Sequence, residues 1–342
     1  METIKNTLAE NFGGSAHNLA GGSHAFSLDD VPDLSGKVAL VTGGSEGIGF
    51  GCTHTLLKHG ISKLFIVSQR KEVIEEAYKA VDEELGAGTS KKIVWLQCDL
   101  SDWERTANIA KEISDQIDRL DIQINNAGRG IMTQQFAETN GIDLHMAANH
   151  FGHVILTSHL LPVMKKTASA GHIVRIVNLA SNAHQGAPSE TAFESVDELQ
   201  KDYGPNGQYG RSKLATLLHA KYLAKHLTSS YPNIIANATH PGIVDTAQTN
   251  IHIHEPYPIL GYGVSAGLKP FRKDQFEGCV STMYAATACE DSGMYIAPPS
   301  IVEQGSAQAN DLELAERLMK LTREVVNEKT EAGKKGCPLR DY

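Results

Sequence analysis

The amino-acid sequence predicts an α/β protein built on a doubly wound, mainly parallel sheet. Short apolar segments rich in β-branched residues alternate along the chain with longer segments that have helical periodicity. A glycine-rich turn follows the first of these apolar segments and precedes the first helical one. The length of 342 residues fits one α/β domain with terminal extensions as well as it fits two domains. We expect a single domain, because the alternation is continuous.

The first strand is expected at 37–42, a buried apolar run between two glycines. Further strands are predicted at 63–67, 92–96, 122–124, 172–179 and 234–239. The helices predicted between and after them are 49–59, 72–85, 103–117, 142–164 and 209–227. Such a strand–helix rhythm places helices on both faces of a parallel sheet.

The chain divides into an N-terminal extension, one domain and a C-terminal segment, with two departures from the alternation inside the domain. The boundaries that we predict are 1–35, 36–305 and 306–342, with the departures at 185–208 and 247–275 and an amphipathic helix at 311–332. The two inserted segments, one polar and one apolar, are expected to form a lid over a substrate.

Composition argues against several classes of function. There are 31 basic and 40 acidic residues, a formal net charge of −9, which disfavours nucleic-acid binding. The five cysteines form no CxxC pair, and His252 and His254 lack a third ligand, so we expect no metal site. No run is long or apolar enough for a secretory signal or a membrane span. These features predict a cytoplasmic protein.

The segment from Thr42 to Gly49 reads Thr-Gly-Gly-Ser-Glu-Gly-Ile-Gly. Glycines at a strand–helix turn allow the backbone to approach a pyrophosphate, whose charge faces the helix N-terminus. This spacing of glycines resembles that of the short-chain dehydrogenase/reductase family, and further motifs extend the resemblance over about residues 36–300. The resemblance implies a Rossmann-type fold and a nicotinamide coenzyme.

The end of the second strand indicates which coenzyme binds. An acidic residue there binds the ribose hydroxyls of NAD, whereas a basic residue accommodates the 2′-phosphate of NADP. This strand is followed by Ser68, Gln69, Arg70 and Lys71, with no acid, so we expect NADP(H). Glu46 is the one disagreement, because many NADP-preferring members of the family have a basic residue at that position.

The helix that begins at Tyr209 carries Lys213 one turn later, on the same face. Reduction of a carbonyl needs a proton donor beside the oxygen, and a nearby ammonium is expected to lower the pKa of the Tyr209 phenol. In the family that this chain resembles, these two residues act with a serine that positions the substrate and with a helix asparagine that relays protons through water. The matching residues are Ser181 and Asn149.

The remaining motifs match coenzyme-contacting segments of the same family, including Asn-Asn-Ala-Gly at 125–128 and Pro-Gly at 241–242. The coenzyme-binding residues implied by the resemblance are Gly43, Ser45, Gly47, Ile48, Gly49, Arg70, Asp99, Leu100, Asn126, Ala127, Gly128, Tyr209, Lys213, Pro241, Gly242, Val244 and Thr246. We expect His240 to be structural, and His184 either contacts substrate or caps a turn.

The predicted activity is therefore interconversion of a carbonyl and an alcohol on an apolar small molecule. The long gap between Ser181 and Tyr209 and the Asn-His-Phe-Gly-His segment after residue 148 resemble the retinol-dehydrogenase-like and WW-domain-oxidoreductase-like branch, which often handles lipophilic substrates. A non-catalytic NADP-binding sensor is the alternative. The resemblance also implies a homodimer through the helices at 142–164 and 209–227, unless the C-terminal helix covers them.

Overall fold

The computed structural model describes residues 12, 26–227, 229–244 and 273–331. These residues contain one eight-stranded sheet with the strand order β3-β2-β1-β4-β5-β6-β7-β8. Its strands are β1 (Val38–Thr42), β2 (Lys63–Ser68), β3 (Ile93–Gln97), β4 (Ile122–Asn125), β5 (Val174–Leu179), β6 (Ile234–Thr239), β7 (Tyr295–Ala297) and β8 (Ile301–Glu303). All neighbouring strands are parallel except β7 and β8. The prediction of a doubly wound parallel sheet is confirmed, with an antiparallel strand added at one edge.

The central strands are buried on both faces, as expected for a parallel sheet that helices cover on both sides. Every residue of β1, β4, β5 and β6 is buried. Alternate residues of β1 belong to different cores: Ala39 and Val41 pack on one face, Val38 and Leu40 on the other. The sheet therefore separates two hydrophobic layers, each covered by helices.

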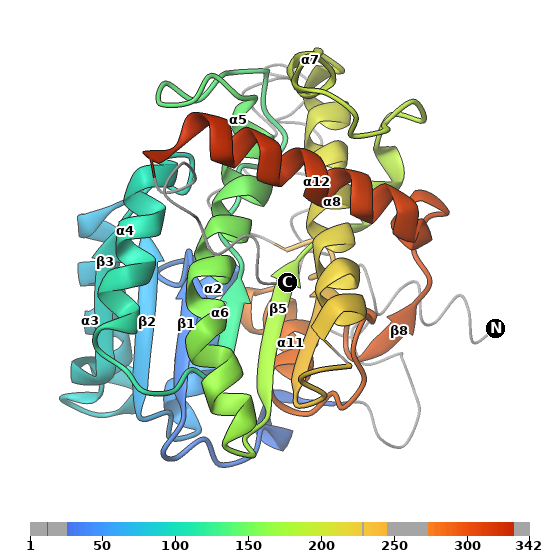
Figure 1. The fold of residues 1–342 in the computed structure, drawn as a ribbon. Helices are drawn as coiled ribbons and strands as arrows, with labels where there is room; N and C mark the ends of the chain where they lie inside the picture. Colours follow the sequence, from blue (N-terminus) through green and yellow to red (C-terminus); the bar gives the residue numbers. More distant parts are fainter. Residues whose placement is uncertain (1–11, 13–25, 228, 245–272, 332–342) are drawn as a thin grey trace.

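Helices cover both faces of the sheet (Figure 1). The principal helices are α2 (Gly47–Lys58), α3 (Lys71–Leu85), α4 (Trp103–Ser114), α6 (His153–Ser169), α8 (Gly204–Leu227), α11 (Gln275–Thr287) and α12 (Leu312–Lys329). Shorter ones are η2 (Leu28–Asp30), η3 (Thr89–Lys92), α5 (Leu144–Met146), η5 (Asn182–Gly186), α7 (Val196–Gln200) and η7 (Gln308–Asn310). Helices α4, α6 and α8 lie on one face, and α2, α3 and α11 on the other.

The long helix predicted at 142–164 is interrupted. The π-helical turn η4 (Ala147–Gly152) separates α5 from α6. A Cβ atom on Gly152 would lie 2.2 Å from the carbonyl oxygen of Leu100, so this turn packs directly against the loop after β3. A π-helical turn shifts the side chains that follow it and is frequent at functional sites. The helical periodicity of the sequence did not indicate this π-helical turn.

Both extensions contribute described residues to the folded domain. Val31 and Leu34 are buried in the same core cluster as residues of α2. The folded domain therefore begins before the predicted boundary at residue 35. The predicted C-terminal helix is present as α12, and it lies across α8 (Figure 1). Leu318 and Val325 of α12 are buried against the cluster that includes Leu217 and Leu218 of α8.

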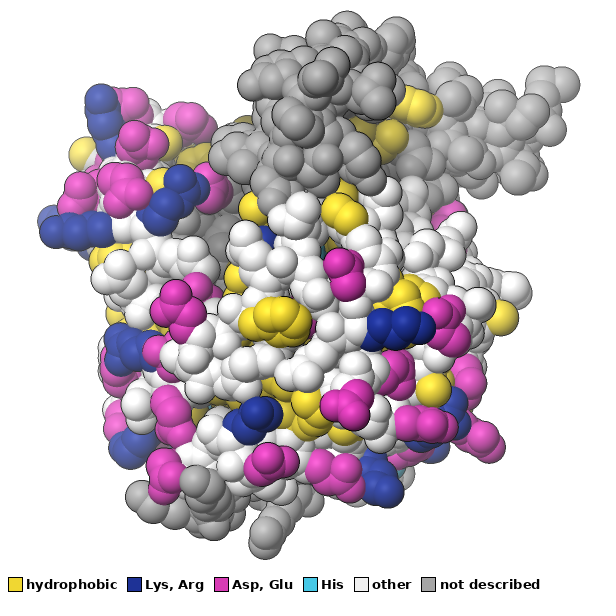
Figure 2. Space-filling model, turned by 90° about the horizontal axis from the view of Figure 1, so that it is seen from above, with side chains coloured by type: hydrophobic (Ala, Val, Ile, Leu, Met, Phe, Trp, Pro, Cys, Tyr) yellow, Lys and Arg dark blue, Asp and Glu magenta, His cyan; other side chains and the backbone are white. Residues whose placement is uncertain are grey.

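The face above the carboxyl ends of the strands carries acidic and basic side chains interspersed with one another (Figure 2). Among the described residues, no helix is long and apolar enough to cross a bilayer. Within the same residues no cluster of three or more metal-ligating side chains occurs, and His252 and His254 lie outside the described ranges. Cys52, Cys98, Cys279 and Cys289 are buried thiols, and Cys337 is not described.

Candidate active site

The glycine loop passes very close to the neighbouring backbone. A Cβ atom on Gly49 would lie 2.0 Å from the carbonyl oxygen of Gly43, a contact that no side chain permits. Gly47 has φ +54°, in the left-handed region that glycine tolerates best. The loop therefore turns sharply into α2 and presents the N-terminus of that helix to the space above β1.

A cavity of about 680 Å³ opens at the carboxyl ends of the central strands, above this loop. This place, where the strand order reverses beside β1, is where open α/β sheets bind ligands. The predicted coenzyme residues that line the cavity are Gly43, Ser45, Gly47, Ile48, Gly49, Arg70, Asp99, Leu100, Asn126, Ala127, Gly128, Tyr209, Lys213, Pro241, Gly242 and Val244. Thr246 lies outside the described residues.

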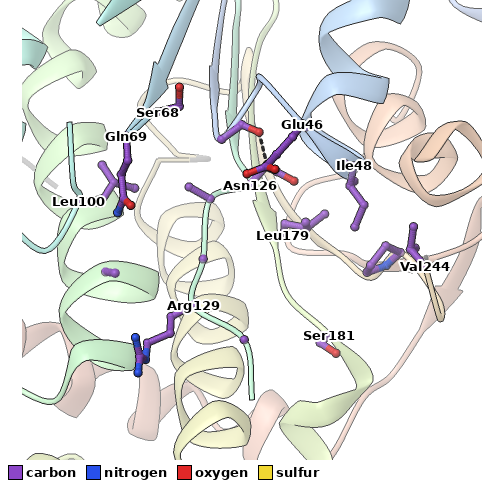
Figure 3. Close-up of a pocket in the computed structure, with 18 of the residues that line it drawn as sticks. Glu46, Ile48, Ser68, Gln69, Leu100, Asn126, Arg129, Leu179, Ser181 and Val244 are labelled. Atoms are coloured by element: carbon purple, nitrogen blue, oxygen red, sulfur yellow. Dashed lines mark hydrogen bonds between the residues drawn. The ribbon is translucent and has the colours of Figure 1, made fainter. Parts of the chain in front are cut away.

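The cavity extends from the end of β2 to the end of β5. Figure 3 shows Gln69 and Leu100 on one side and Ser181 and Val244 on the other. Its size, its glycine-lined floor and the helix N-terminus fit a dinucleotide with its pyrophosphate at the loop.

The junction of β1 and β4 is held by one threonine. The hydroxyl of Thr42 accepts hydrogen bonds from the backbone N–H groups of Asn126 and Ala127, each 2.9 Å long. That hydroxyl lies 2.9 Å from Nε2 of His153, whose Nδ1 lies 3.1 Å from the carbonyl oxygen of Asn149. With two donors already on the Thr42 oxygen, its own proton goes to His153, which therefore carries its hydrogen on Nδ1. These bonds connect β1, β4 and η4 beneath the cavity.

A charged pair lies at the end of β2, where the coenzyme's 2′-substituent is expected. Nη2 of Arg70 lies 2.5 Å from Oε1 of Glu46, and both side chains are about half exposed. The pKa of Arg70 is raised, chiefly by this hydrogen bond. Asp99, on the neighbouring strand end, accepts hydrogen bonds of 2.8 Å from the backbone and hydroxyl of Ser101.

Tyr209, Lys213 and Ser181 converge on the opposite part of the cavity. Nζ of Lys213 lies 5.6 Å from the centroid of the Tyr209 ring and donates a 2.7 Å hydrogen bond to the carbonyl oxygen of Leu179. Burial lowers the pKa of Lys213 to about 8. Burial raises the pKa of Tyr209 to about 12, and a hydrogen bond with Ser181 opposes this rise. The expected lowering of the phenol pKa by Lys213 is therefore not found: desolvation of the phenolate dominates, and the opposing contribution comes from Ser181.

Ser181 is held at the N-terminus of η5. Its hydroxyl accepts a 3.1 Å hydrogen bond from the N–H of Ala183, which points the oxygen toward the cavity end of β5. Nδ1 of His184 lies 2.7 Å from the carbonyl oxygen of Ser181, and its Nε2 accepts a 3.0 Å hydrogen bond from the N–H of Ser306. His184 is completely buried. It therefore fastens the Ser181 turn to the segment before α12 and is not available to substrate.

Asn149 lies in the π-helical turn and is not among the residues that line the cavity. Its side chain accepts a 2.6 Å hydrogen bond from the N–H of Arg129 and donates to the carbonyl oxygen of Arg129 and the hydroxyl of Ser212, each at 2.9 Å. Its own carbonyl oxygen lies 3.3 Å from the hydroxyl of Thr216. The side chain thus fixes the backbone after Gly128, a role that sequence reasoning missed. The proton relay through its carbonyl stays a prediction.

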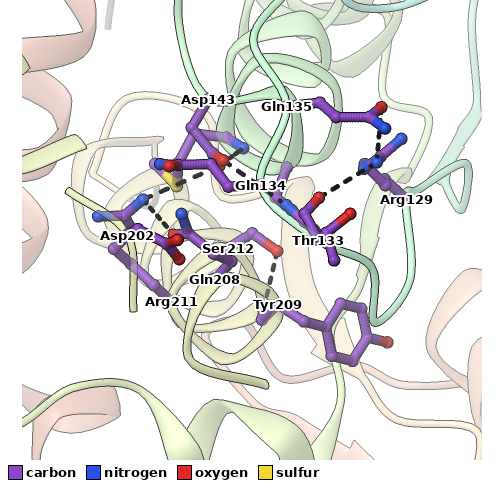
Figure 4. A network of polar contacts seen from close by, with 12 residues as sticks. Arg129, Thr133, Gln134, Gln135, Asp143, Asp202, Gln208, Tyr209, Arg211 and Ser212 are labelled. Atoms are coloured by element: carbon purple, nitrogen blue, oxygen red, sulfur yellow. Dashed lines mark hydrogen bonds and ion pairs between the residues drawn. The ribbon is translucent and has the colours of Figure 1, made fainter. Parts of the chain in front are cut away.

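A buried arginine anchors the start of α8 (Figure 4). Arg211 donates hydrogen bonds of 2.7 Å to the carbonyl oxygens of Glu198 and Leu199 and to the side chain of Gln208, and it lies 3.8 Å from the carboxylate of Asp143. Because Arg211 follows Tyr209 by two residues, this network ties the part of the helix that carries Tyr209 to α5 and α7. None of the described residues 185–208 lines the cavity, so their role in a lid stays a prediction.

Several residues that line the cavity belong to no motif that the sequence analysis identified. Arg129, Met132, Leu144 and Ala148 line it, and Gln275 joins them from α11. The signal that was available for Arg129 is its place directly after the Asn-Asn-Ala-Gly segment.

His240, expected to be structural, is buried and accepts a 3.2 Å hydrogen bond from the N–H of Gly242. This hydrogen bond supports the Pro241–Gly242 turn. His240 is not among the residues that line the cavity.

Comparison with known proteins agrees with this geometry. Residues 37–255 match the family model described as short chain dehydrogenase. The Neurospora crassa oxidoreductase bli-4 is 51% identical over the whole of this chain and 84% of its own length. The human polyprenol dehydrogenase is 30% identical over 77% of this chain and 76% of its own length.

Solved structures give the same fold. A protein of Mycobacterium paratuberculosis covers 88% of this chain and 97% of its own with a TM-score of 0.68 at 23% identity. The RhlG/NADP complex of Pseudomonas aeruginosa has a TM-score of 0.57 and 26% identity, covering 77% of this chain and 95% of its own.

One prediction is corrected by these relatives. The Neurospora crassa protein, similar along the full length of this chain, is named as mitochondrial. The predicted cytoplasmic location, which depended on the absence of a secretory signal and of a membrane span, is therefore wrong. Neither absence distinguishes the cytoplasm from the interior of an organelle.

Proposed function

Since the chain belongs to the short chain dehydrogenase family, we propose that it is an NADP(H)-dependent oxidoreductase that interconverts a carbonyl and an alcohol on an apolar small molecule. The observation that carries the proposal is the convergence of Tyr209, Ser181 and Lys213 on the cavity whose other end is the glycine loop. A sensor that only binds coenzyme has no use for these three side chains beside the nicotinamide end.

Tyr209 is the proposed proton donor. The bound coenzyme supplies or takes the hydride at the substrate carbon. During reduction, the Tyr209 hydroxyl gives its proton to the carbonyl oxygen, and during oxidation the phenolate takes it back. Ser181 donates a hydrogen bond to the same oxygen and fixes its distance from the phenol. A carbonyl oxygen that gains negative charge in a buried site makes the transfer of the Tyr209 proton more favourable.

Lys213 has the proposed roles of binding the coenzyme ribose and holding a positive charge beside the Tyr209 ring. Its ammonium stays close to the phenol because Leu179 accepts one of its three hydrogens. A pKa of about 8 leaves it mainly protonated at neutral pH, so it presents a positive charge to the site during turnover.

Two observations support NADP(H). The end of β2 offers Ser68 and Gln69 in place of an acid, and Arg70 lines the cavity there. The Pseudomonas aeruginosa relative is described as an NADP complex. A guanidinium is well suited to a 2′-phosphate because it can donate two parallel hydrogen bonds.

The described walls around the catalytic end support an apolar substrate. Met132, Leu144, Ala148 and Ile243 are among the lining residues, and such walls favour apolar ligands with a few polar groups that orient them. Polyprenol dehydrogenase, by its name, acts on a lipophilic alcohol. We propose that the substrate is likewise lipophilic, and that this chain, like the Neurospora crassa relative, is mitochondrial.

Transfer of deuterium tests the reaction class. The protein is incubated with a panel of aliphatic, aromatic and isoprenoid ketones and aldehydes and with NADPH deuterated at C4, in separate preparations for the two faces of the ring. We expect one preparation to pass deuterium to the alcohol carbon, detected by mass spectrometry. Tight coenzyme binding without transfer to any carbonyl of the panel favours the sensor instead.

A further inference from the structure

The coenzyme-selective end of the cavity contains two opposed charges. Arg70 is the group that would bind a 2′-phosphate, and its Nη2 atom lies 2.5 Å from Oε1 of Glu46. Both residues line the cavity, Glu46 from the loop before α2 and Arg70 from the end of β2. The pair therefore lies at the place where a phosphorylated and an unphosphorylated coenzyme differ.

Two further carboxylates act electrostatically on the same arginine. Glu72 and Glu76 of α3 both act on Arg70 electrostatically, in the same direction as Glu46. Lys71, the second cation after β2, lies 3.6 Å from Glu75. A phosphate dianion entering here meets a guanidinium that already has a carboxylate partner, and it is repelled by that carboxylate.

The chemistry of Glu46 suits the other coenzyme. A carboxylate at this end of a dinucleotide site accepts hydrogen bonds from ribose hydroxyls. The end of β2 carries no acidic residue that could do so. Glu46 has an extended backbone, and its carboxylate accepts no capping hydrogen bond from the N–H groups of α2. The carboxylate is therefore not committed to the helix that it precedes.

We propose that Glu46 supplies, from the glycine loop, the ribose-binding carboxylate that the end of β2 lacks, and that it competes with the 2′-phosphate for Arg70. The chain then binds NADPH and NADH with affinities that differ by less than about tenfold, because Arg70 favours one and Glu46 the other. This inference rests on the proposed function, and it concerns binding alone.

Two fragments isolate the 2′-phosphate without any catalytic step. Adenosine 2′,5′-bisphosphate and adenosine 5′-monophosphate differ only in that group, and calorimetry measures their dissociation constants with the full-length protein. Titration of NADPH and NADH fluorescence provides the same comparison for whole coenzymes. The variants are Glu46→Gln, Arg70→Gln and the double variant, with Glu72→Gln as the matched control.

We expect Glu46→Gln to raise the preference for the 2′-phosphorylated ligand at least tenfold. The variant should bind adenosine 2′,5′-bisphosphate more tightly and adenosine 5′-monophosphate more weakly than the wild type does. Arg70→Gln should lower that preference, and Glu46→Gln should have a smaller effect on the phosphorylated ligand when Arg70 is already replaced. Glu72→Gln removes a charge that acts on Arg70 without replacing the side chain paired with it. It should change the preference by less than threefold.

Three results would overturn the inference. The first is a wild-type preference for either coenzyme above about tenfold. The second is an unchanged preference in Glu46→Gln, and the third is an equal effect of Glu46→Gln and Glu72→Gln. Failure of the wild-type protein to bind either coenzyme would instead reject the proposed function, and this inference with it.

Discussion

Replacing Lys213 by methionine separates the stability of the fold from its chemistry. Lys213 is 5% exposed, and burial lowers its pKa from 10.5 to about 8. The difference, at about 1.36 kcal/mol per pH unit, means that holding the charged form in the folded protein costs about 3 kcal/mol. Methionine fills a similar volume without that cost, but it leaves the carbonyl oxygen of Leu179 without its 2.7 Å hydrogen bond. That loss costs about 1–3 kcal/mol, so the net change at pH 7 is small.

The pH dependence of the stability difference between wild type and Lys213→Met reports the buried charge alone, because the lost hydrogen bond to Leu179 does not titrate. Below pH 8 the lysine is protonated in both states, and the full cost of burying the charge is present. Between pH 8 and 10.5 the folded protein has lost its proton while the unfolded chain keeps it, so the wild type gains stability relative to Lys213→Met as pH rises. Above pH 10.5 both states are neutral and the difference is constant.

Urea denaturation at several pH values between 7 and 10.5 measures this difference. We expect the free energy of unfolding of the wild type, minus that of Lys213→Met, to rise by about 3 kcal/mol across the range. Lys225→Met, whose side chain is 46% exposed, is the control for removing a lysine from the same helix. Parallel curves for wild type and Lys213→Met would refute the reasoning that Lys213 is a buried charge.

Three further substitutions test the site and its support. Gly49→Ala places a Cβ atom 2.0 Å from the carbonyl oxygen of Gly43, so coenzyme affinity should fall more than tenfold by titration, whereas Gly186→Ala, which meets nothing within 4 Å, should leave it unchanged. Arg211→Leu leaves two carbonyl oxygens and Asp143 without their cation and should cost about 3–5 kcal/mol in urea, and a loss below 1 kcal/mol would contradict the anchoring role. Leu318→Ala in α12 should cost about 2–5 kcal/mol, against less than about 0.5 kcal/mol for the exposed Leu312→Ala, and equal losses would mean that α12 is not part of the core.

The central fold was predictable because its signals are local. The bounds of strands β1 to β6 lie within two residues of their predicted bounds, and the glycine loop follows from the needs of a pyrophosphate. Strands β7 and β8 have three residues each, too short for a periodic pattern, and they exist through pairing with β6 and with each other. Such strands depend on tertiary contacts.

Sequence motifs indicated most of the described residues that line the cavity, with Asn149 as an exception, but not how they interact. The π-helical turn depends on contacts of Asn149 with Arg129 and of Gly152 with the loop at Leu100, which lie far away in sequence. The Glu46–Arg70 pair joins residues 24 positions apart in different loops. The raised pKa of Tyr209 depends on how strongly the surrounding protein desolvates the phenolate, and no motif reports that desolvation.

The most direct test of the central claim compares two phenylalanine variants of one helix. Tyr209→Phe removes the proposed proton donor, and Tyr222→Phe removes a hydroxyl that lies 3.0 Å from Nη1 of Arg323, away from the cavity. With a ketone that the wild type reduces, we predict that kcat falls by about 10²–10⁴ in Tyr209→Phe and by less than threefold in Tyr222→Phe, while NADPH affinity is retained in both. A kcat for Tyr209→Phe equal to that of the wild type would contradict the account.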